Sequence, residues 1–396
     1  MSSKTPRLFA YVGTYTGSAD GGIHILKVSK DGRELSSTGH ASQPKESGYL
    51  AYAASTGTLY AVNERKTDGR GPVEAPAAVH SFTVNQQDGS LTPLGSRPAP
   101  GPFPTFLSVS DDQRRLISAN HGSFEHVEHV VKGRDGEWTV EYLYDDSSVL
   151  VYDLGTDGAI GKLTDVKVIE GHGKDPNFSP QAGGHAQASP HAHCAVIDPS
   201  GRYLLVADKG TDRIYVYTLG ATLELAFTHQ CAPETGPRHI AFDPVSGNAY
   251  VTLEFASKLA AFAFDPRSGE LALLDEVTST ESGHTGLNEP AEVRVHPDGD
   301  IVYVNNRGED SLAWFSVSEA GKLTRQGHTD LAPSLHPGVA ARNFSIDPTG
   351  SFLLVADRPA ALVRSYAIDN ETGALTPLTE ISIPEPAFVQ FVELTG

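Results

Sequence analysis

A hairpin-like segment recurs six times along this chain, and it constrains the fold more strongly than any other feature of the sequence. The two most similar copies, residues 193–209 and 342–358, share an Ile-Asp-Pro-x-Gly turn and the run Leu-Leu-Val-Ala-Asp. Looser copies occupy residues 49–64, 105–121, 238–254 and 291–307. In each copy an alternating apolar segment, a polar turn and a second apolar segment follow one another, which is the pattern of a β-hairpin.

Two more short apolar segments follow the hairpin, so that one repeat predicts four strands. Third strands are expected at residues 214–217, 259–264, 312–315 and 363–368, each trailed by a Gly-x-Leu turn and a fourth strand. The positions that begin the turns, Asp198, Asp243, His296 and Asp347, are 45, 53 and 51 residues apart. Four strands at this spacing are typical of a β-propeller blade and exclude a solenoid of helices.

The two ends of the chain supply one more blade. Residues 388–393 have the pattern of a first strand with no blade after it, whereas residues 8–15 and 22–28 resemble later strands with no first strand before them. Joined in one sheet, these segments hide strand edges that would otherwise be exposed. The sequence therefore predicts an all-β fold, a seven-bladed β-propeller with four-stranded antiparallel blades, in which residues 1–396 form one domain.

One stretch departs from the repeat length, because Ser110 and Asp198 lie 88 residues apart. A blade needs only about 50 residues, so we expect an insertion around residues 122–146 and a loop around residues 171–190. These segments are loops or an added hairpin at the rim of a blade, and they form either a solvated insertion or a flap over the mouth of the channel. The order Glu-His-Val-Glu-His at 125–129 differs from the HExxH motif of zinc peptidases.

The charge balance excludes one class of partner. The chain has 30 Lys and Arg against 49 Asp and Glu, a formal net charge of −19, which is the wrong sign for a nucleic-acid partner. It has no run of 18 apolar residues and no apolar segment at its start, so we expect no membrane partner and a cytoplasmic location. Two cysteines, Cys194 and Cys231, are too few for a disulfide framework.

Ionisable residues occupy one equivalent position, the end of the second strand, in all six repeats. They are Glu64, His121, Lys209, Glu254, Arg307 and Arg358. Because equivalent positions of a propeller converge around its axis, this pattern predicts a polar ring at one face. The alternative is that these residues form salt bridges between blades and cap turns.

A second set of polar residues begins the innermost strands, namely His193, Arg238 and Arg342, with His239 directly after Arg238. His191 and His193 share one side of an extended strand, which leaves metal binding, acid-base chemistry and plain packing as alternatives. The arginines and Lys209 favour a small anionic ligand, because guanidinium groups bind phosphate or carboxylate through paired hydrogen bonds.

Several motifs occur together in a recognisable order: Tyr-Val-Gly-Thr-Tyr at 11–15, Leu-Tyr-Ala-Val-Asn-Glu at 59–64, His-Ala-His at 191–193, Gly-Pro-Arg-His at 236–239 and Asn-Arg-Gly at 306–308. On these residues the chain resembles the seven-bladed lactonase family, which contains propeller-type bacterial 6-phosphogluconolactonase and the fungal carboxy-muconate cyclases. The resemblance implies a metal-independent active site in the central cleft, with no cofactor. It places catalysis on His191 or His193, Arg238, Glu254 and Arg307. We expect substrate to be bound further by Glu64, His121, Lys209, His239, Arg342 and Arg358.

Three functions follow as alternatives. The favoured one is hydrolysis of a sugar lactone, above all 6-phosphogluconolactone to 6-phosphogluconate, with arginines binding the anionic group and the lactone carbonyl and His193 or Glu254 activating water. The second is a muconate-type cyclisation by a lyase or isomerase. The third is a noncatalytic propeller that binds a protein or ligand on one face. The cations in the channel favour the first, with a sugar phosphate lactone or a carboxylated lactone as substrate.

Overall fold

The two most similar turns form because the aspartate at the start of each one caps the backbone that follows. Asp198 accepts the N–H of the residue five positions later at 2.6 Å and the N–H two positions later at 2.9 Å. Asp347 repeats both bonds at 2.8 and 2.9 Å. Gly201 and Gly350 lie in these turns with φ of +68° and +75°, a conformation that glycine adopts without strain.

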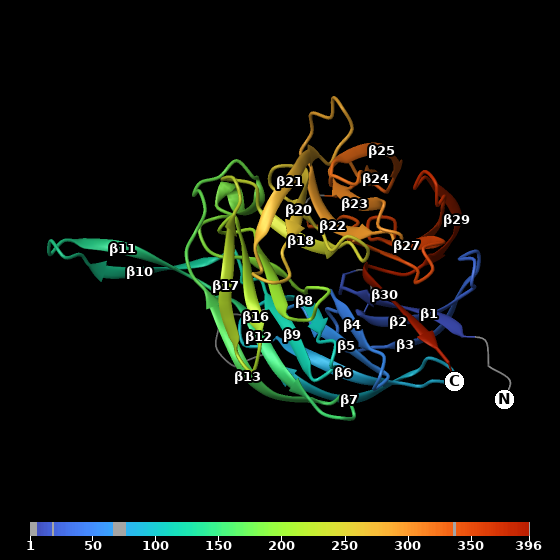
Figure 1. Cartoon of the computed structure of the whole chain (residues 1–396). Coiled ribbons are helices and arrows are strands. Elements are labelled where there is room, and N and C mark those ends of the chain that lie inside the picture. The colour runs from blue at the N-terminus through green and yellow to red at the C-terminus, as the bar shows by residue number, and fades with distance from the viewer. Residues whose placement is uncertain (1–5, 18–19, 66–76, 336–337, 396) are drawn as a thin grey trace.

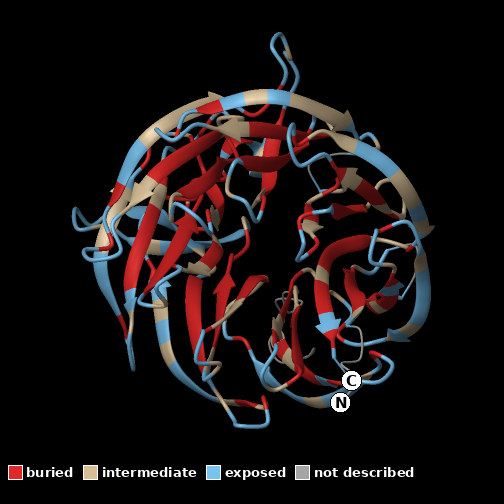
Figure 2. Ribbon diagram, turned by 45° about the vertical axis from the view of Figure 1, so that its right-hand side comes forward, coloured by how far each residue is buried: buried red, intermediate tan, exposed pale blue. Residues whose placement is uncertain are grey.

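The hairpins assemble into a ring in the computed structural model, which describes residues 6–17, 20–65, 77–335 and 338–395 (Figure 1). Seven four-stranded antiparallel sheets surround a common axis, with buried strands inside and exposed segments at the rim (Figure 2). This arrangement confirms the predicted seven-bladed β-propeller.

The first blade contains both chain ends. It is built from β1 (Arg7–Thr14), β2 (Gly22–Val28), β3 (Leu35–Ala41) and β30 (Pro386–Leu394). The strand order is β3-β2-β1-β30, so the C-terminal strand is the innermost one. It pairs with β1 from Arg7 opposite Leu394 to Thr14 opposite Pro386, which confirms the predicted closure.

The second to fourth blades follow in chain order. The second has β4 (Leu50–Ala53), β5 (Thr58–Asn63), β6 (Ala78–Val84) and β7 (Leu91–Pro98); the third has β8 (Pro104–Val109), β9 (Arg115–Asn120), β12 (Ser147–Leu154) and β13 (Ile160–Ile169); the fourth has β14 (Ala192–Ile197), β15 (Tyr203–Asp208), β16 (Arg213–Leu219) and β17 (Leu223–Gln230).

The fifth to seventh blades complete the ring. The fifth has β18 (Pro237–Phe242), β19 (Ala249–Leu253), β20 (Lys258–Phe264) and β21 (Leu271–Thr278); the sixth has β22 (Glu289–Val295), β23 (Ile301–Arg307), β24 (Ser311–Val317) and β25 (Leu323–Asp330); the seventh has β26 (Asn343–Ile346), β27 (Phe352–Asp357), β28 (Leu362–Ile368) and β29 (Leu375–Ser382).

Three of the described elements, two strands and one short helix, lie outside the blades. Strands β10 (His126–Lys132) and β11 (Trp138–Tyr144) form a separate two-stranded sheet that projects from the third blade (Figure 1). The short 3₁₀ helix η1 (Gln181–Gly184) interrupts the loop between the third and fourth blades. Across the described residues, no helix has the length and apolar character needed to cross a bilayer.

Aromatic rings from three consecutive blades pack together next to the axis. Tyr49 lies 4.0 Å from Phe388 of the first blade and 4.3 Å from Phe106 of the third blade, measured between ring centroids. All three side chains are buried. This apolar packing fixes the inner strands that carry the polar residues of the channel.

Candidate active site

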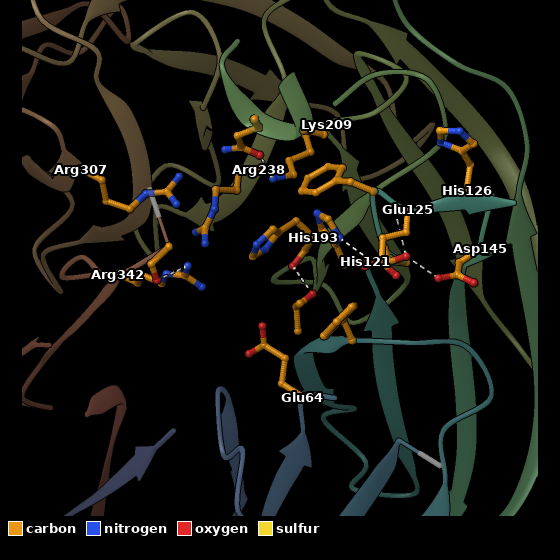
Figure 3. Close-up of a pocket in the computed structure, with 18 of the residues that line it drawn as sticks. Glu64, His121, Glu125, His126, Asp145, His193, Lys209, Arg238, Arg307 and Arg342 are labelled. Atoms are coloured by element: carbon orange, nitrogen blue, oxygen red, sulfur yellow. Dashed lines mark hydrogen bonds between the residues drawn. The ribbon is translucent and has the colours of Figure 1, made fainter. Parts of the chain in front are cut away.

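A cavity of about 860 Å³ lies at the axis, where strand ends of several blades meet (Figure 3). Of the predicted site residues, its wall contains Glu64, His121, His193, Lys209, Arg238, Arg307 and Arg342. A smaller cavity of about 30 Å³ shares part of this wall. Figure 3 shows Arg238, Arg307 and Arg342 on one side, and Glu125, His126 and Asp145 on the other.

Glu254 forms ion pairs with three cations on one side of the cavity. Its Oε1 lies 3.0 Å from Nζ of Lys209, and its Oε2 lies 2.8 Å from Nε of Arg238 and 3.2 Å from Nη2 of Arg307. Burial raises the pKa of Glu254, but the charges of Lys209, Arg307 and Arg238 outweigh it and hold the pKa well below its ordinary value. Glu254 therefore remains an anion that fixes the three cations in place.

Gln181 and Glu289 complete this polar network. The side-chain amide of Gln181 donates to Glu254 and to Oε1 of Glu289 at 2.9 Å, while its carbonyl oxygen accepts from Nζ of Lys209 at 3.0 Å. Arg307 donates through Nε to the backbone carbonyl of Glu289 at 2.9 Å. The cationic wall is therefore positioned by the protein itself, as preorganised electrostatic stabilisation requires.

The cations of the wall can still bind an anionic ligand. Burial and the neighbouring Arg307 lower the pKa of Arg238 to about 10, which leaves it charged near neutral pH. Within the described part of the chain, Nη1 of Arg238 is buried and has no hydrogen-bond acceptor. With Arg342, four cations face the carboxylates of Glu254, Glu289 and Glu64, so this side of the cavity carries a formal excess of positive charge. The carboxylates of Glu125 and Asp145 lie on the opposite side.

His193 is linked to a buried carboxylate through His239. Nε2 of His239 lies 3.2 Å from Nδ1 of His193, and Nδ1 of His239 lies 3.2 Å from Oε1 of Glu292. Asn343 donates to the other oxygen of Glu292 at 2.6 Å. Burial raises the pKa of Glu292, but Arg294 and His239 outweigh it and lower the pKa to about 2, so Glu292 accepts hydrogen bonds as an anion.

The order of these contacts sets the protonation of His193. Burial lowers the pKa of His239 to about 4, so this ring is neutral and carries its proton on Nδ1, facing Glu292. Its Nε2 then accepts from Nδ1–H of His193. Burial and Arg238 lower the pKa of His193 well below its ordinary value. His193 is therefore a neutral imidazole with its proton on Nδ1, so its Nε2 carries the lone pair that can accept a proton.

Glu64 carries a second ionisable group in the wall. Its Oε2 accepts a hydrogen bond from the hydroxyl of Tyr15 at 2.6 Å. Burial raises the pKa of Glu64, although Arg342 and the bond from Tyr15 oppose that shift. Figure 3 places Glu64 below the arginines, at the edge of the same cavity.

Four predicted site residues lie outside the wall of the main cavity. His191 is fully buried, its ring stacks on His121 at 4.5 Å, and its Nδ1 lies 3.0 Å from the carbonyl oxygen of His121. Glu254 lies behind the cations, and His239 contributes only to the smaller cavity. Arg358 pairs with Glu385 at 2.7 Å. These positions argue against direct contact of His191, Glu254 or Arg358 with substrate.

Sequence reasoning missed the residues that come from outside the repeats. Gln181 lies in the loop around 171–190, and Asp145 follows the projecting β10–β11 sheet; both line the cavity. No repeat position marks them, so only their proximity to histidine-rich loops gave a signal. In the described residues, no three His, Cys, Asp or Glu side chains are grouped so that they could hold a metal ion.

Comparisons with known proteins agree with this architecture. A family model described as "Lactonase, 7-bladed beta-propeller" matches residues 9–391. A 6-phosphogluconolactonase of Bacillus subtilis (strain 168) is 29% identical over 389 residues, which cover 98% of this chain and 99% of that protein. A 6-phosphogluconolactonase of Pectobacterium carotovorum subsp. carotovorum (strain PC1) is 30% identical over 325 residues, 80% of this chain and 82% of that protein.

The comparison with solved structures also finds a lactonase with a similar fold. The periplasmic gluconolactonase of Pseudomonas aeruginosa has a TM-score of 0.80 and 27% identity, with 98% of this chain and 99% of that chain covered. The match of the family model to nearly the whole sequence is the decisive finding. The chain belongs to the family of seven-bladed β-propeller lactonases.

Proposed function

We propose that this protein hydrolyses an anionic sugar lactone, with 6-phosphogluconolactone as the favoured substrate. The observation that carries the proposal is the juxtaposition of a preorganised cationic wall with a neutral histidine in one cavity. The relatives named 6-phosphogluconolactonase support the same substrate class. A phosphorylated substrate also agrees with the cytoplasmic location that the sequence predicts.

His193 is the proposed general base. Its Nε2 takes a proton from water while the water oxygen bonds to C1 of the lactone. The carbonyl oxygen becomes an oxyanion, and Arg238 stabilises it because this guanidinium lines the same cavity as His193 and its buried Nη1 has no acceptor among the described residues. Collapse of the intermediate breaks the bond between C1 and the ring oxygen. The proton held by His193 passes to that oxygen, which leaves a carboxylic acid and a hydroxyl group.

The remaining wall residues bind and orient the substrate. Arg307 and Arg342 hold the phosphate, because guanidinium groups pair with phosphate oxygens through two N–H donors. Glu64 accepts from sugar hydroxyls at the edge of the cavity. Glu254 acts as a positioning residue, since it contacts the cations and lies outside the cavity wall.

The test compares 6-phosphogluconolactone with unphosphorylated gluconolactone, after subtraction of spontaneous hydrolysis. His193→Ala should lower kcat on both substrates at least about 100-fold, the effect of losing a general base. Arg342→Ala should raise KM for the phosphorylated lactone at least about tenfold, the loss of one charge-assisted hydrogen bond, and leave gluconolactone turnover nearly unchanged.

Two outcomes would contradict the proposal. One is equal loss on both substrates in Arg342→Ala, which would remove the assignment of the phosphate site. The other is failure of the wild-type protein to hydrolyse either lactone while it consumes a muconate-type diacid, followed by the ultraviolet absorbance of the conjugated diene. That result would favour the cyclase alternative.

A further inference from the structure

The two-stranded sheet of β10 and β11, called the arm here, lies apart from the ring (Figure 1). Its strands pair along their whole length, from His126 opposite Tyr144 to Lys132 opposite Trp138. Neither strand pairs with any other strand in the described residues. An isolated two-stranded hairpin is only marginally stable in water, so this arm lacks the third and fourth strands that usually support one.

One face of the arm carries a group of apolar side chains that are open to solvent, beside Glu128 and Lys132. Side chains alternate between the faces of a strand, and paired residues share a face. The register therefore places Val130, Val140, Tyr142 and Trp138 together, and their side chains are 66%, 41%, 53% and 71% exposed. Contiguous exposed apolar surface of this kind marks an interaction site in a protein that folds stably.

We propose that the arm pairs with the arm of a second copy of this chain, through antiparallel pairing of the two β10 edges about a twofold axis at Val130. The charges on β10 give the register. Glu128 and Lys132 lie two residues on either side of Val130 and on the same face. In this pairing Glu128 of each copy lies opposite Lys132 of the other, so a twofold axis creates two favourable cross-strand pairs.

The outer edge of β11 offers no such match. Between Trp138 and Tyr144 the only charged residue is Glu141, so two copies of this strand bring no opposite charges together. Pairing through β10 produces a four-stranded sheet with the arms side by side and the two propellers at its ends. A hairpin that is marginal alone then gains the two additional strands that confer stability.

Charge exchange in the full-length protein tests this pairing. Sedimentation velocity over a wide range of protein concentration gives the dissociation constant of the dimer. Glu128→Lys and Lys132→Glu each place two pairs of like charges opposite one another, and each should raise the dissociation constant at least about tenfold. The double variant Glu128→Lys/Lys132→Glu should return it to the wild-type range.

Mixing provides an independent readout. A mixture of the two single variants should form heterodimers more tightly than either variant alone forms homodimers, because their charges are complementary. Glu319→Lys makes the same charge change at an exposed turn between β24 and β25 and should leave dimerisation unchanged. Far-UV circular dichroism of every variant establishes that the propeller is folded.

Three results would overturn the proposal. The wild-type protein could sediment as a monomer at every concentration. The dimer could persist unchanged in both single variants, which would assign it to another surface. The double variant and the mixture could fail to restore association while both remain folded, which would exclude the pairing register about Val130.

Discussion

Among single residues, Glu254 has the largest influence on the geometry of the site, because it contacts cations from three different blades. Lys209, Arg238 and Arg307 follow β15, begin β18 and end β23, and their charged groups meet at this one carboxylate. Without its charge, three buried cations would repel one another with little solvent to screen them. The carboxylate thus serves both folding and the geometry of substrate binding.

Replacing Glu254 by glutamine tests both roles, in the stability of the fold and in the geometry of substrate binding. We expect Glu254→Gln to lower the free energy of unfolding by about 3–5 kcal/mol, the cost of leaving buried charges without their partner. Lactone turnover should fall as well, because Arg238 and Arg307 lose the contact that orients them. Urea unfolding and initial rates measure the two effects.

The matched control is Glu276→Gln, which removes a partly exposed ion pair with Lys258. Exposed pairs contribute at most about 1 kcal/mol, so this variant should be nearly as stable as the wild type. A Glu254→Gln protein with unchanged stability would show that the three cations do not depend on the carboxylate.

The sequence predicts which residues approach the axis better than it predicts how deep each one lies. Glu64 and Glu254 occupy the same position of the repeat, yet Glu64 lines the cavity and Glu254 is completely buried. Lys209, Arg238 and Arg307 contact Glu254, and Gln181 reaches it from a loop outside the repeats. Repeat alignment carries no information about such a loop, so it does not show that Glu254 lies behind the cations.

Neighbouring blades are connected by a recurring tyrosine at the scale of elements. Tyr11, Tyr60 and Tyr303 occupy equivalent positions on β1, β5 and β23, and each is completely buried. Their hydroxyls donate to the carbonyl oxygens of Gly89, Gly158 and Gly373 at 2.7, 2.8 and 2.9 Å. Each acceptor lies in the turn between the two outer strands of the following blade, so one hydrogen bond ties each blade to the next.

Tyr303→Phe should therefore destabilise the ring. The substitution removes the hydroxyl and leaves the carbonyl of Gly373 without this donor, at a cost of about 1–3 kcal/mol in the free energy of unfolding. Chemical denaturation followed by circular dichroism measures the change.

Tyr250 provides a control at the equivalent position of β19. It is completely buried, but its hydroxyl forms no hydrogen bond to the following blade in the described residues. Tyr250→Phe should change stability by less than about 1 kcal/mol, since it removes no inter-blade bond. Equal losses in the two variants would refute the connecting role of the hydroxyl.

The ring as a whole could be predicted from the sequence, because the strand patterns at the two ends of the chain indicate how the ring closes. The first strand at 388–393 and the later strands at 8–15 and 22–28 complement one another, and they pair as β30, β1 and β2. The excess length of the third repeat predicts an insertion around residues 122–146, where the arm lies, but it does not predict the direction in which the arm projects. The insertion has no counterpart in the other repeats with which it could be aligned. Its orientation relative to the ring depends on tertiary contacts, and a pattern of alternating apolar residues does not specify those contacts.

The stability of the whole molecule should fall steeply in weak acid, because neutral histidines cluster around its axis. Burial and Lys209 lower the pKa of His191 to about 3, and burial lowers the pKa of His239 to about 4; the pKa values of His121 and His193 are also lowered. In the unfolded chain these histidines bind protons below about pH 6.5. The unfolded state then binds more protons than the native state, so stability is lost as pH falls from about 6.5 toward 4.

Asp208 works in the opposite direction and reduces the effect. Burial raises the pKa of Asp208 to about 6, so the native state binds this proton before the unfolded state does. Near pH 5 the four histidines and Asp208 together leave the unfolded state with about three more bound protons than the native state. Because each proton of difference contributes about 1.4 kcal/mol per pH unit, we expect a net loss on the order of 4 kcal/mol per pH unit. Urea unfolding at a series of pH values between about 7 and 5 gives this slope.

One substitution isolates the contribution of a single buried ring. His191→Gln removes a group that only the unfolded state protonates, so the slope near pH 5 should decrease by up to about 1.4 kcal/mol per pH unit. This holds even where the variant is less stable at every pH, because the readout is the slope. His172→Gln, at an exposed position, should leave the slope unchanged. A slope that is the same in His191→Gln and the wild type would mean that the axial histidines are not what couples the stability of the propeller to acid.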